Sequence, residues 1–242
     1  MSTRNCPAWV CGLALLIAGM AAHATSRPAV VELFTSEGCS SCPPAEEYLG
    51  ELTGRSDVLA LSFHVDYWDD LGWRDPFSLA AFTTRQRGYA SRLKLSAIFT
   101  PQVIVDGQES LLGSDRRAIS ASLRSSREAS VALALTEQNG ALVVAVTPAP
   151  TSEAADLFFV SFRRQVKSSI GRGENQGRTL QEFNVVRELR VIGHSAGSPL
   201  QLRVPVASVP KDATDIAVLA QRHGQGEILG AVRLALPANP QS

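Results

Sequence analysis

Cys39 and Cys42 lie three positions apart in the stretch TSEGCSSCPPAEEYL, directly after the apolar run VVELF. A cysteine pair with this spacing can exchange disulfides with a partner, bind a metal ion or staple a turn. A staple across so short a loop would add only about 2 kcal/mol, against about 3 kcal/mol for a 15-residue loop. A chain of this length can bury its own core without that help. The spacing therefore favours redox or metal chemistry over a purely structural bridge.

Disulfide exchange requires a thiolate, and the residues around the pair are suited to forming one. The following segment, PAEEYLGELTG, predicts a helix that ends at Gly54. The N–H groups and partial positive charge at a helix N-terminus lower the pKa of a nearby thiol. We therefore expect Cys39 to be the exposed nucleophile and Cys42 the more buried resolving thiol. Glu37 would oppose the thiolate if it lies close.

Residues 1–24 have the pattern of a bacterial secretory signal. A single charge, Arg4, precedes a short apolar run, and Ala22-His23-Ala24 matches a small-x-small cleavage site. The apolar run is shorter than the ~20 residues that comfortably span a bilayer. We expect cleavage before Thr25 and a periplasmic or secreted protein with no stable membrane anchor, the alternative being a retained anchor.

Cleavage after residue 24 would also change the cysteine count. Cys6 and Cys11 would leave with the signal, so Cys39 and Cys42 would be the remaining thiols. In an oxidising compartment these two can pair with each other or with a partner.

The composition is that of an ordinary soluble protein. The full chain has 23 basic and 23 acidic residues, so it has no basic excess that would indicate nucleic-acid binding. We expect no nucleic-acid partner and no cofactor. The length after residue 24 suits one large domain or two small ones.

The apolar pattern divides the chain near residues 126–130. From residue 29 to about 127, short apolar runs alternate with helical segments and predict the order β-α-β-α-β-β-α, an α/β layer fold. Ser114 is the expected cap of the last helix, and a hairpin is expected to turn at Asp106-Gly107.

After Ala129 apolar residues recur at every second position, which is the pattern of β-strands. An Asn139-Gly140 turn indicates another hairpin. About seven strands without a convincing helix predict an antiparallel sandwich. We therefore expect a signal peptide at 1–24, an α/β domain at 25–128, a β-sandwich-like domain at 129–237 and a tail at 238–242.

Residues 29–127 resemble the thioredoxin-like superfamily. The element order matches, a Cys-x-x-Cys pair follows the first strand and opens a helix, and Thr100-Pro101 begins the strand of the later hairpin. Nearly the whole chain after the signal resembles an uncharacterised secreted bacterial thioredoxin-like family with a C-terminal β domain. The segments that carry this resemblance are ELFTSEGCSSCPPAE, HVDYWD, TPQVIVDG and GRGENQGRTLQEFNVV.

The resemblance implies roles for particular residues. Pro101 would follow a cis bond and lie against the cysteine pair, and the Thr100 backbone would hydrogen-bond a bound peptide. Glu32, in the first strand, would move protons for the second cysteine, a task that suits a buried carboxyl. The alternative for Glu32 is an ion pair with an arginine.

The chain differs from ordinary thioredoxins around the pair. Gly38 stands where a tryptophan usually precedes the first cysteine, the dipeptide is Ser40-Ser41, and DYWDDLGWRDPF is an insertion before the second helix. These differences leave the exchange chemistry in place but bear on the substrate range.

His64 and the following residues come after the second strand, at the sheet edge where α/β folds place their sites. Tyr67 and Trp68, with Thr100, are the candidate substrate-binding residues. Cys39, Cys42 and His64 could instead bind copper or zinc, because soft thiolates suit Cu(I) and Zn²⁺.

Two glycine-rich stretches imitate known motifs. GRGENQG, residues 171–177, resembles a phosphate loop, but it joins two strands and no helix follows to receive a phosphate. GHSAGS, residues 193–198, contains a G-x-S-x-G pattern around Ser195 but lacks the strand-turn-helix setting that a hydrolase nucleophile needs.

The sequence thus predicts a thiol-disulfide oxidoreductase-like protein whose partners are protein or peptide thiols and disulfides. Cys39, Cys42, Pro101 and Glu32 are the candidate catalytic residues. A copper- or zinc-binding carrier and a non-catalytic interaction module are the alternatives.

Overall fold

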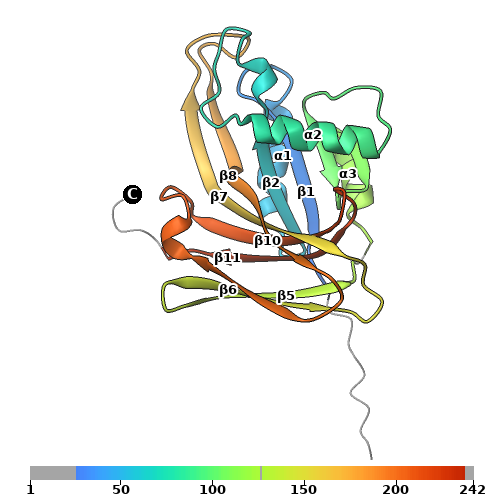
Figure 1. Ribbon diagram of the computed structural model, residues 1–242. Helices are drawn as coiled ribbons and strands as arrows, with labels where there is room; N and C mark the ends of the chain where they lie inside the picture. The colour runs from blue at the N-terminus through green and yellow to red at the C-terminus, as the bar shows by residue number, and fades with distance from the viewer. Residues whose placement is uncertain (1–25, 126, 238–242) are drawn as a thin grey trace, which may run out of the picture.

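The computed structural model of the protein describes residues 26–125 and 127–237, and its strands form one large and one small sheet (Figure 1). The predicted signal peptide and tail lie outside the described residues. In spatial order, the eight strands of the large sheet are β11 (Ile228–Ala235), β10 (Asp215–Arg222), β7 (Ala155–Ser169), β8 (Thr179–Ser195), β2 (Val58–His64), β1 (Ala29–Thr35), β3 (Gln102–Val105) and β4 (Glu109–Leu112).

The smaller sheet and the helices complete the architecture. The three strands are β5 (Val131–Gln138), β6 (Ala141–Pro148) and β9 (Leu200–Pro205). The helices are α1 (Pro43–Thr53), α2 (Ala80–Arg92) and α3 (Arg116–Ser122), with short 3-10 turns η1 (Asp66–Trp68) and η2 (Val206–Ser208). No helix among the described residues is both long enough and apolar enough to cross a membrane.

The predicted strands and helices of residues 29–127 form in the predicted order, with small differences at their ends. The second helix begins at Ala80, after the inserted segment DYWDDLGWRDPF. Asp115, and not Ser114, caps α3, because its side chain accepts a hydrogen bond from the Ala118 N–H at 2.9 Å. Both predicted hairpin turns form, and their central residues have the positive φ angles that such turns require.

The prediction of an α/β thioredoxin-like domain followed by a separate antiparallel sandwich is wrong. Strand β8 lies beside β2 in parallel, with Ser62 opposite Val185, so β7, β8, β10 and β11 continue the sheet that β1 and β2 begin. A two-residue period shows that one face of a strand is buried but not which sheet the strand joins. The large sheet is therefore mixed, and it includes strands from both sides of the predicted boundary at residues 128 and 129.

The core on the α2 side of the large sheet contains residues from both parts of the chain. Phe34 and Phe63 from β1 and β2 pack with Phe82 and Tyr89 from α2. The later strands complete the same core with Val160, Phe162, Val186, Ala217 and Leu219. Helices α1 and α3 cover the opposite face of β1, β2 and β3, where a second core includes Leu33, Leu49 and Ile119.

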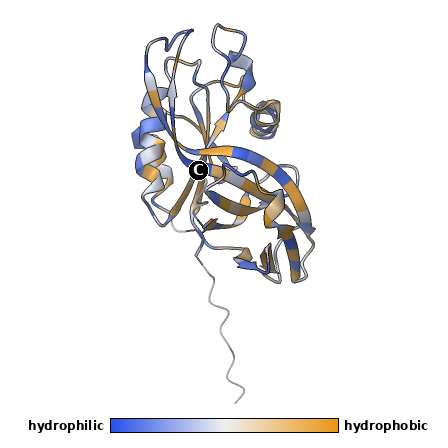
Figure 2. Ribbon diagram, turned by 90° about the vertical axis from the view of Figure 1, so that its left-hand side faces the viewer, coloured by the Kyte–Doolittle hydropathy of each residue, from blue (hydrophilic) through white to orange (hydrophobic). Residues whose placement is uncertain are grey.

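The small sheet packs against the β7 and β10 end of the large sheet. Leu142 and Val144 from β6 share a buried cluster with Leu157, Phe159 and Val218. Hydrophobic and hydrophilic residues alternate along the long curved strands, as expected for strands with one buried face (Figure 2).

Helix α1 lies close to β8 because Gly50 has no side chain. A Cβ atom placed on Gly50 would lie 2.5 Å from the Phe183 ring. This close approach brings the first turns of α1 and the start of β8 together, and the candidate site lies there.

Candidate functional site

Cys39 and Cys42 form a disulfide immediately before helix α1. The loop turns tightly, since the Cys42 N–H donates to the Cys39 carbonyl at 3.2 Å, and the Ala45 N–H donates to the Cys42 carbonyl at 2.9 Å. The Ser41 hydroxyl lies 3.4 Å from the Cys39 sulfur, within hydrogen-bonding reach. The predicted position of the pair, between the first strand and the first helix, is confirmed.

The expectation that Cys39 is exposed is not met in this disulfide form. Cys39 is 0% exposed and Cys42 is 1% exposed, whereas Ser40 and Ser41 between them are exposed. The loop that joins β7 to β8 lies over the cysteine loop. The buried Asn175 donates its side-chain N–H groups to the carbonyls of Glu37 and Cys39 at 2.8 and 3.0 Å.

The same β7–β8 loop also holds the exposed part of the cysteine loop. Glu174 accepts hydrogen bonds from the backbone N–H and the hydroxyl of Ser40 at 3.1 and 2.6 Å. This loop is the GRGENQG segment, and it connects two strands as expected. We call the contacts of Glu174 and Asn175 with the cysteine loop the hairpin clasp.

The inserted segment after β2 packs on the other side of the cysteine loop. Trp68 donates its indole N–H to the Thr100 hydroxyl at 2.9 Å, and a Cβ placed on Gly38 would lie 3.3 Å from the Trp68 Cβ. Trp68 therefore links Gly38 to Thr100, in a place where a larger residue than glycine would crowd it. Tyr67 packs against the core on the α2 side.

The Thr100–Pro101 bond is cis, as predicted. Pro101 is buried, and a Cβ placed on Gly113 would meet both the Pro101 Cβ at 2.8 Å and the Ala45 Cβ at 3.1 Å. Pro101 thus lies near the first turn of α1.

Glu32 forms an ion pair, the alternative considered from the sequence. Its carboxylate accepts hydrogen bonds from the Arg85 guanidinium at 2.5 and 2.9 Å, and both residues are buried. The Tyr89 hydroxyl also donates to Glu32, and Gln221 from β10 contacts both Arg85 and Tyr89. Glu32 is thus bound in a network that joins β1, α2 and β10.

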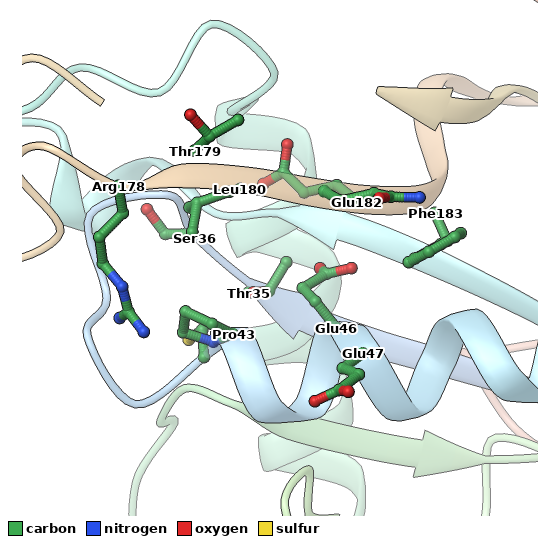
Figure 3. A pocket seen from close by; sticks show the side chains of 12 residues that line it. Thr35, Ser36, Pro43, Glu46, Glu47, Arg178, Thr179, Leu180, Glu182 and Phe183 are labelled. Carbon is green, nitrogen blue, oxygen red and sulfur yellow. The ribbon is translucent and has the colours of Figure 1, made fainter. Parts of the chain in front are cut away.

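A pocket of about 280 Å³ lies between α1 and the start of β8, and Cys42 forms part of its wall (Figure 3). Apolar surface comes from Pro43, Leu180 and Phe183. Charged side chains also line the pocket: Glu46, Glu47, Arg178 and Glu182. The disulfide therefore borders the pocket through Cys42.

Behind the pocket, His64 is the centre of a buried group of carboxyls. Its Nδ1 lies 2.7 Å from an Asp75 oxygen, and its Nε2 lies 3.9 Å from a Glu182 oxygen. Burial alone would lower the pKa of His64, but the charges of Asp75 and Glu182 outweigh it and raise the pKa to about 10. His64 is thus a cation at neutral pH, and its charge holds the pKa of Asp75 below its usual value against the effect of burial.

The pKa values of the other carboxyl groups around His64 are raised, whereas that of Asp75 is lowered. Burial raises the pKa of Glu182 to about 8, although His64 opposes the shift, and Glu46 and Glu37 add to it. Burial also raises the pKa values of Glu46 and Glu37. Glu46 accepts a hydrogen bond from the Ser62 hydroxyl at 2.6 Å, and Glu37 accepts one from the Trp73 indole at 2.6 Å.

These contacts decide the surroundings of His64. Nδ1 of the histidine ring contacts Asp75, and Nε2 faces Glu182 at 3.9 Å. No group of three His, Cys, Asp or Glu residues within 26–125 and 127–237 has the geometry to hold a metal ion. His194 and His223 both lie beside Asp156, with Nδ1 to Oδ1 distances of 2.7 and 3.1 Å.

Sequence reasoning missed Glu46, Glu182 and Asn175. Glu46 could have been predicted from the sequence, because a residue four positions after Cys42 on a helix lies on the same face. Glu182 and Asn175 come from a part of the chain that only the joined sheet brings to the cysteines.

Fold and site together define a class: a protein built on a large mixed sheet, with a disulfide at the start of a helix beside an acidic pocket. The chain belongs to the family described as "Protein of unknown function (DUF1223)", whose match covers residues 30–221. A search of the curated proteins found no match.

Two solved structures are similar to this chain. A crystal structure of an Agrobacterium tumefaciens protein is 30% identical, with a TM-score of 0.74, and the match covers 86% of this chain and 93% of that one. HBP35 of Porphyromonas gingivalis is 14% identical, with a TM-score of 0.58, and the match covers 87% of this chain and 76% of that one. The second likeness concerns the fold alone.

Proposed function

We propose that this protein is a thiol-disulfide oxidoreductase that acts on protein or peptide thiols through Cys39 and Cys42. The observation that carries the proposal is the disulfide between them, placed directly before helix α1 and bordering a pocket through Cys42. The local arrangement of strand, Cys-x-x-Cys and helix is similar to that of the thioredoxin-like superfamily, and this likeness supports the exchange chemistry.

In the exchange, one disulfide replaces another. A thiolate of a reduced partner attacks the Cys39 sulfur, the Cys39–Cys42 bond breaks, and Cys42 leaves as a thiolate that takes up a proton. A second partner thiol, losing its proton, then attacks the partner's sulfur in the mixed disulfide. This step releases the oxidised partner and leaves Cys39 as a thiolate, which can also be protonated. Run in reverse, the same steps reduce a partner disulfide.

The surroundings of the two sulfurs favour Cys39 as the residue that forms the mixed disulfide. Ser41 can donate a hydrogen bond to a Cys39 thiolate, and the N-terminus of α1 adds partial positive charge. Cys42 shares its pocket with Glu46, Glu47 and Glu182. This buried acidic site raises the pKa values of Glu46 and Glu182, and it disfavours a second thiolate for the same reason. Cys39 is thus the better nucleophile and Cys42 the better proton acceptor.

We also propose that the protein works in the periplasm or outside the cell after loss of residues 1–24. The signal-like pattern of these residues supports export. An oxidising compartment would keep the pair in the disulfide form that the structure contains.

Trapping of a mixed disulfide tests this function. Reduced Cys42→Ser protein, prepared from the exported fraction of expressing cells, is incubated with a disulfide-bonded peptide and followed by intact-mass spectrometry. We expect a covalent adduct on Cys39 that reductant releases, because no second thiol remains to resolve it. Cys39→Ser should form little adduct, and the same spectra should show a chain that begins at Thr25.

The Cys39→Ser/Cys42→Ser double variant is the control for adducts that do not involve the pair. If folded Cys42→Ser protein forms no adduct on Cys39, the oxidoreductase proposal fails. Equal trapping by both single variants would contradict the assignment of Cys39 as the nucleophile.

A further inference from the structure

We propose that the pocket beside Cys42 binds a basic side chain, lysine or arginine, of the protein or peptide whose cysteine exchanges with the pair. This inference rests on the proposed function and names a feature of its substrate. It follows from the carboxyl groups in the pocket, the shape of its walls and its position against the disulfide.

Two carboxyl oxygens at the pocket are buried and have no partner. Glu46 is 4% exposed and Glu182 is 2% exposed, and both side chains line the pocket. Within the part of the chain that the structure describes, Oε2 of Glu46 and Oε2 of Glu182 make no hydrogen bond. The same is true of Nε2 of His64, which lies 3.9 Å from Oε1 of Glu182. Buried carboxyl oxygens are normally satisfied, and the His64 Nε2 is too far from Glu182 for a hydrogen bond, so a donor that enters the pocket would satisfy them.

The charges around these carboxyls point to a cationic donor. Three other titratable groups face them: His64 from β2, Asp75 from the inserted segment and Glu37 from the cysteine loop. His64 is paired closely with Asp75, at 2.7 Å, and lies 3.9 Å from Glu182. One imidazolium therefore serves four carboxyl groups, and Glu182 holds a proton at neutral pH because burial raises its pKa to about 8. A cation bound in the pocket would take the place of that proton and pair with the carboxylate.

The walls of the pocket suit the stem of a long basic side chain. Pro43, Leu180 and Phe183 provide apolar surface beside the carboxyl groups. Lysine and arginine lay their methylene groups along such surface while the charged end seeks polar partners. The volume of about 280 Å³ is just below the range of small-molecule sites and is adequate for one side chain.

Among residues 26–125 and 127–237, Arg178 is the basic residue that lines the pocket, and it lies away from the carboxyl groups of Glu46 and Glu182. Arg178 donates to the Asn175 side chain at 2.9 Å and so is held at the hairpin clasp. Figure 3 shows Arg178 extending toward Pro43, whereas Glu46 and Phe183 lie further along α1 and β8. A basic side chain can thus reach the carboxyl groups while its backbone remains near Cys42.

Binding of redox-inert peptides tests this inference separately from the exchange reaction. Two fluorescently labelled, blocked peptides carry serine in place of cysteine and differ at one neighbouring position, which is lysine in one and norleucine in the other. Their affinities for the oxidised protein are measured by fluorescence anisotropy at low ionic strength. We expect the lysine peptide to bind about tenfold more tightly, the size of effect that one charge-assisted hydrogen bond gives.

Variants of Glu182 and Glu46 test whether the preference for the lysine peptide arises in the pocket. Glu182→Gln and Glu46→Gln should each reduce the preference for lysine, and the double variant should abolish it. Glu109→Gln, which removes one exposed charge from β4, should leave the preference unchanged.

Equal affinity for the lysine and norleucine peptides, or no binding of either, would overturn the inference. The comparison of the two peptides on the unmodified protein decides the matter even if a variant fails to fold. If the protein prefers the lysine peptide but forms no mixed disulfide, the proposed site for a basic side chain stands and only the oxidoreductase function fails.

Discussion

The surroundings of Glu182 disfavour the ionised form of its carboxyl group. Glu182 lies at the start of β8, almost fully buried, with His64 as its nearest cation and with Glu46, Glu37 and Asp75 around it. Glu32, by contrast, is just as buried but has Arg85 in direct contact. The two glutamates therefore differ in role: Glu32 holds elements together, and Glu182 keeps an acidic group beside the disulfide.

The raised pKa values of Glu182 and His64 predict how the free energy of unfolding depends on pH. Glu182 titrates near its usual pKa of 4.5 when unfolded and at about 8 when folded, so the folded state holds more protons between these values. His64 holds its proton in the folded state up to about pH 10, against 6.5 when unfolded. Both groups make the free energy of unfolding fall as pH rises, Glu182 between pH 4.5 and 8 and His64 between pH 6.5 and 10.

Urea unfolding of the oxidised protein at a series of pH values measures this effect. Each unit of pKa difference is worth about 1.4 kcal/mol, so we expect a decrease on the order of a few kcal/mol from mildly acidic to alkaline pH. Glu182→Gln should reduce the fall on the acidic side, and Glu109→Gln should not. A stability that rises over this range, or an unchanged slope in a folded Glu182→Gln protein, would show that the glutamate is not buried as described.

At the scale of elements, the loop between β7 and β8 covers the cysteine loop. Asn175 binds the backbone of Glu37 and Cys39, and Glu174 binds Ser40, so the loop holds both the buried and the exposed parts of the cysteine loop. Cys39 is 0% exposed, so we expect a partner to reach its sulfur only after these contacts open. Local opening of this kind has its own free-energy cost, which is set by the hydrogen bonds it breaks.

Removal of the hairpin clasp should therefore expose the disulfide. Asn175→Ala deletes the two hydrogen bonds to the cysteine loop and the one that Asn175 accepts from Arg178. The two bonds to the cysteine loop are worth about 1 kcal/mol each, so we expect dithiothreitol to reduce the pair roughly thirtyfold faster. The measurement is a time course of thiol alkylation read by mass spectrometry. Gln176→Ala is the matched control, because Gln176 is exposed and its side chain makes no hydrogen bond to the cysteine loop in the described part of the chain. Equal reduction rates for a folded Asn175→Ala protein and the unmodified protein would contradict the clasp.

At the scale of the whole molecule, one mixed sheet makes the two parts of the chain depend on each other. Phe34 and Phe63 share a core with Phe162 and Leu219, which come from β7 and β10. Strand β2 has β8 as its outer neighbour. Without the later strands, the first part of the chain would expose both an apolar face and an unpaired strand edge.

A fragment of residues 25–128 is therefore expected not to fold by itself. Near-ultraviolet circular dichroism and urea unfolding should show no fixed aromatic environment and no cooperative transition, whereas a chain of residues 25–237 should show both. A sigmoidal unfolding curve for the short fragment would show that the α/β part is an independent unit.

The sequence alone was sufficient for the local features of this protein. The apolar runs placed β1 and β2, the Asn139-Gly140 pair placed a hairpin, and the cysteines were correctly placed at the start of α1. Each of these features depends on residues that are near one another in the chain. The cis bond at Pro101 was predicted from resemblance, because the sequence around one proline does not decide its isomer.

Tertiary structure decided how the strands are divided between sheets and which groups surround the cysteines. The period of two in β7 and β8 is the same whether these strands form a separate sandwich or extend the first sheet, so it could not exclude the wrong fold. The pairing of Ser62 with Val185 brings Glu182 to the pocket and Asn175 to the Cys39 carbonyl. Such contacts join residues more than a hundred positions apart, and they form because the buried faces of the strands must share one core, a requirement that no local pattern records.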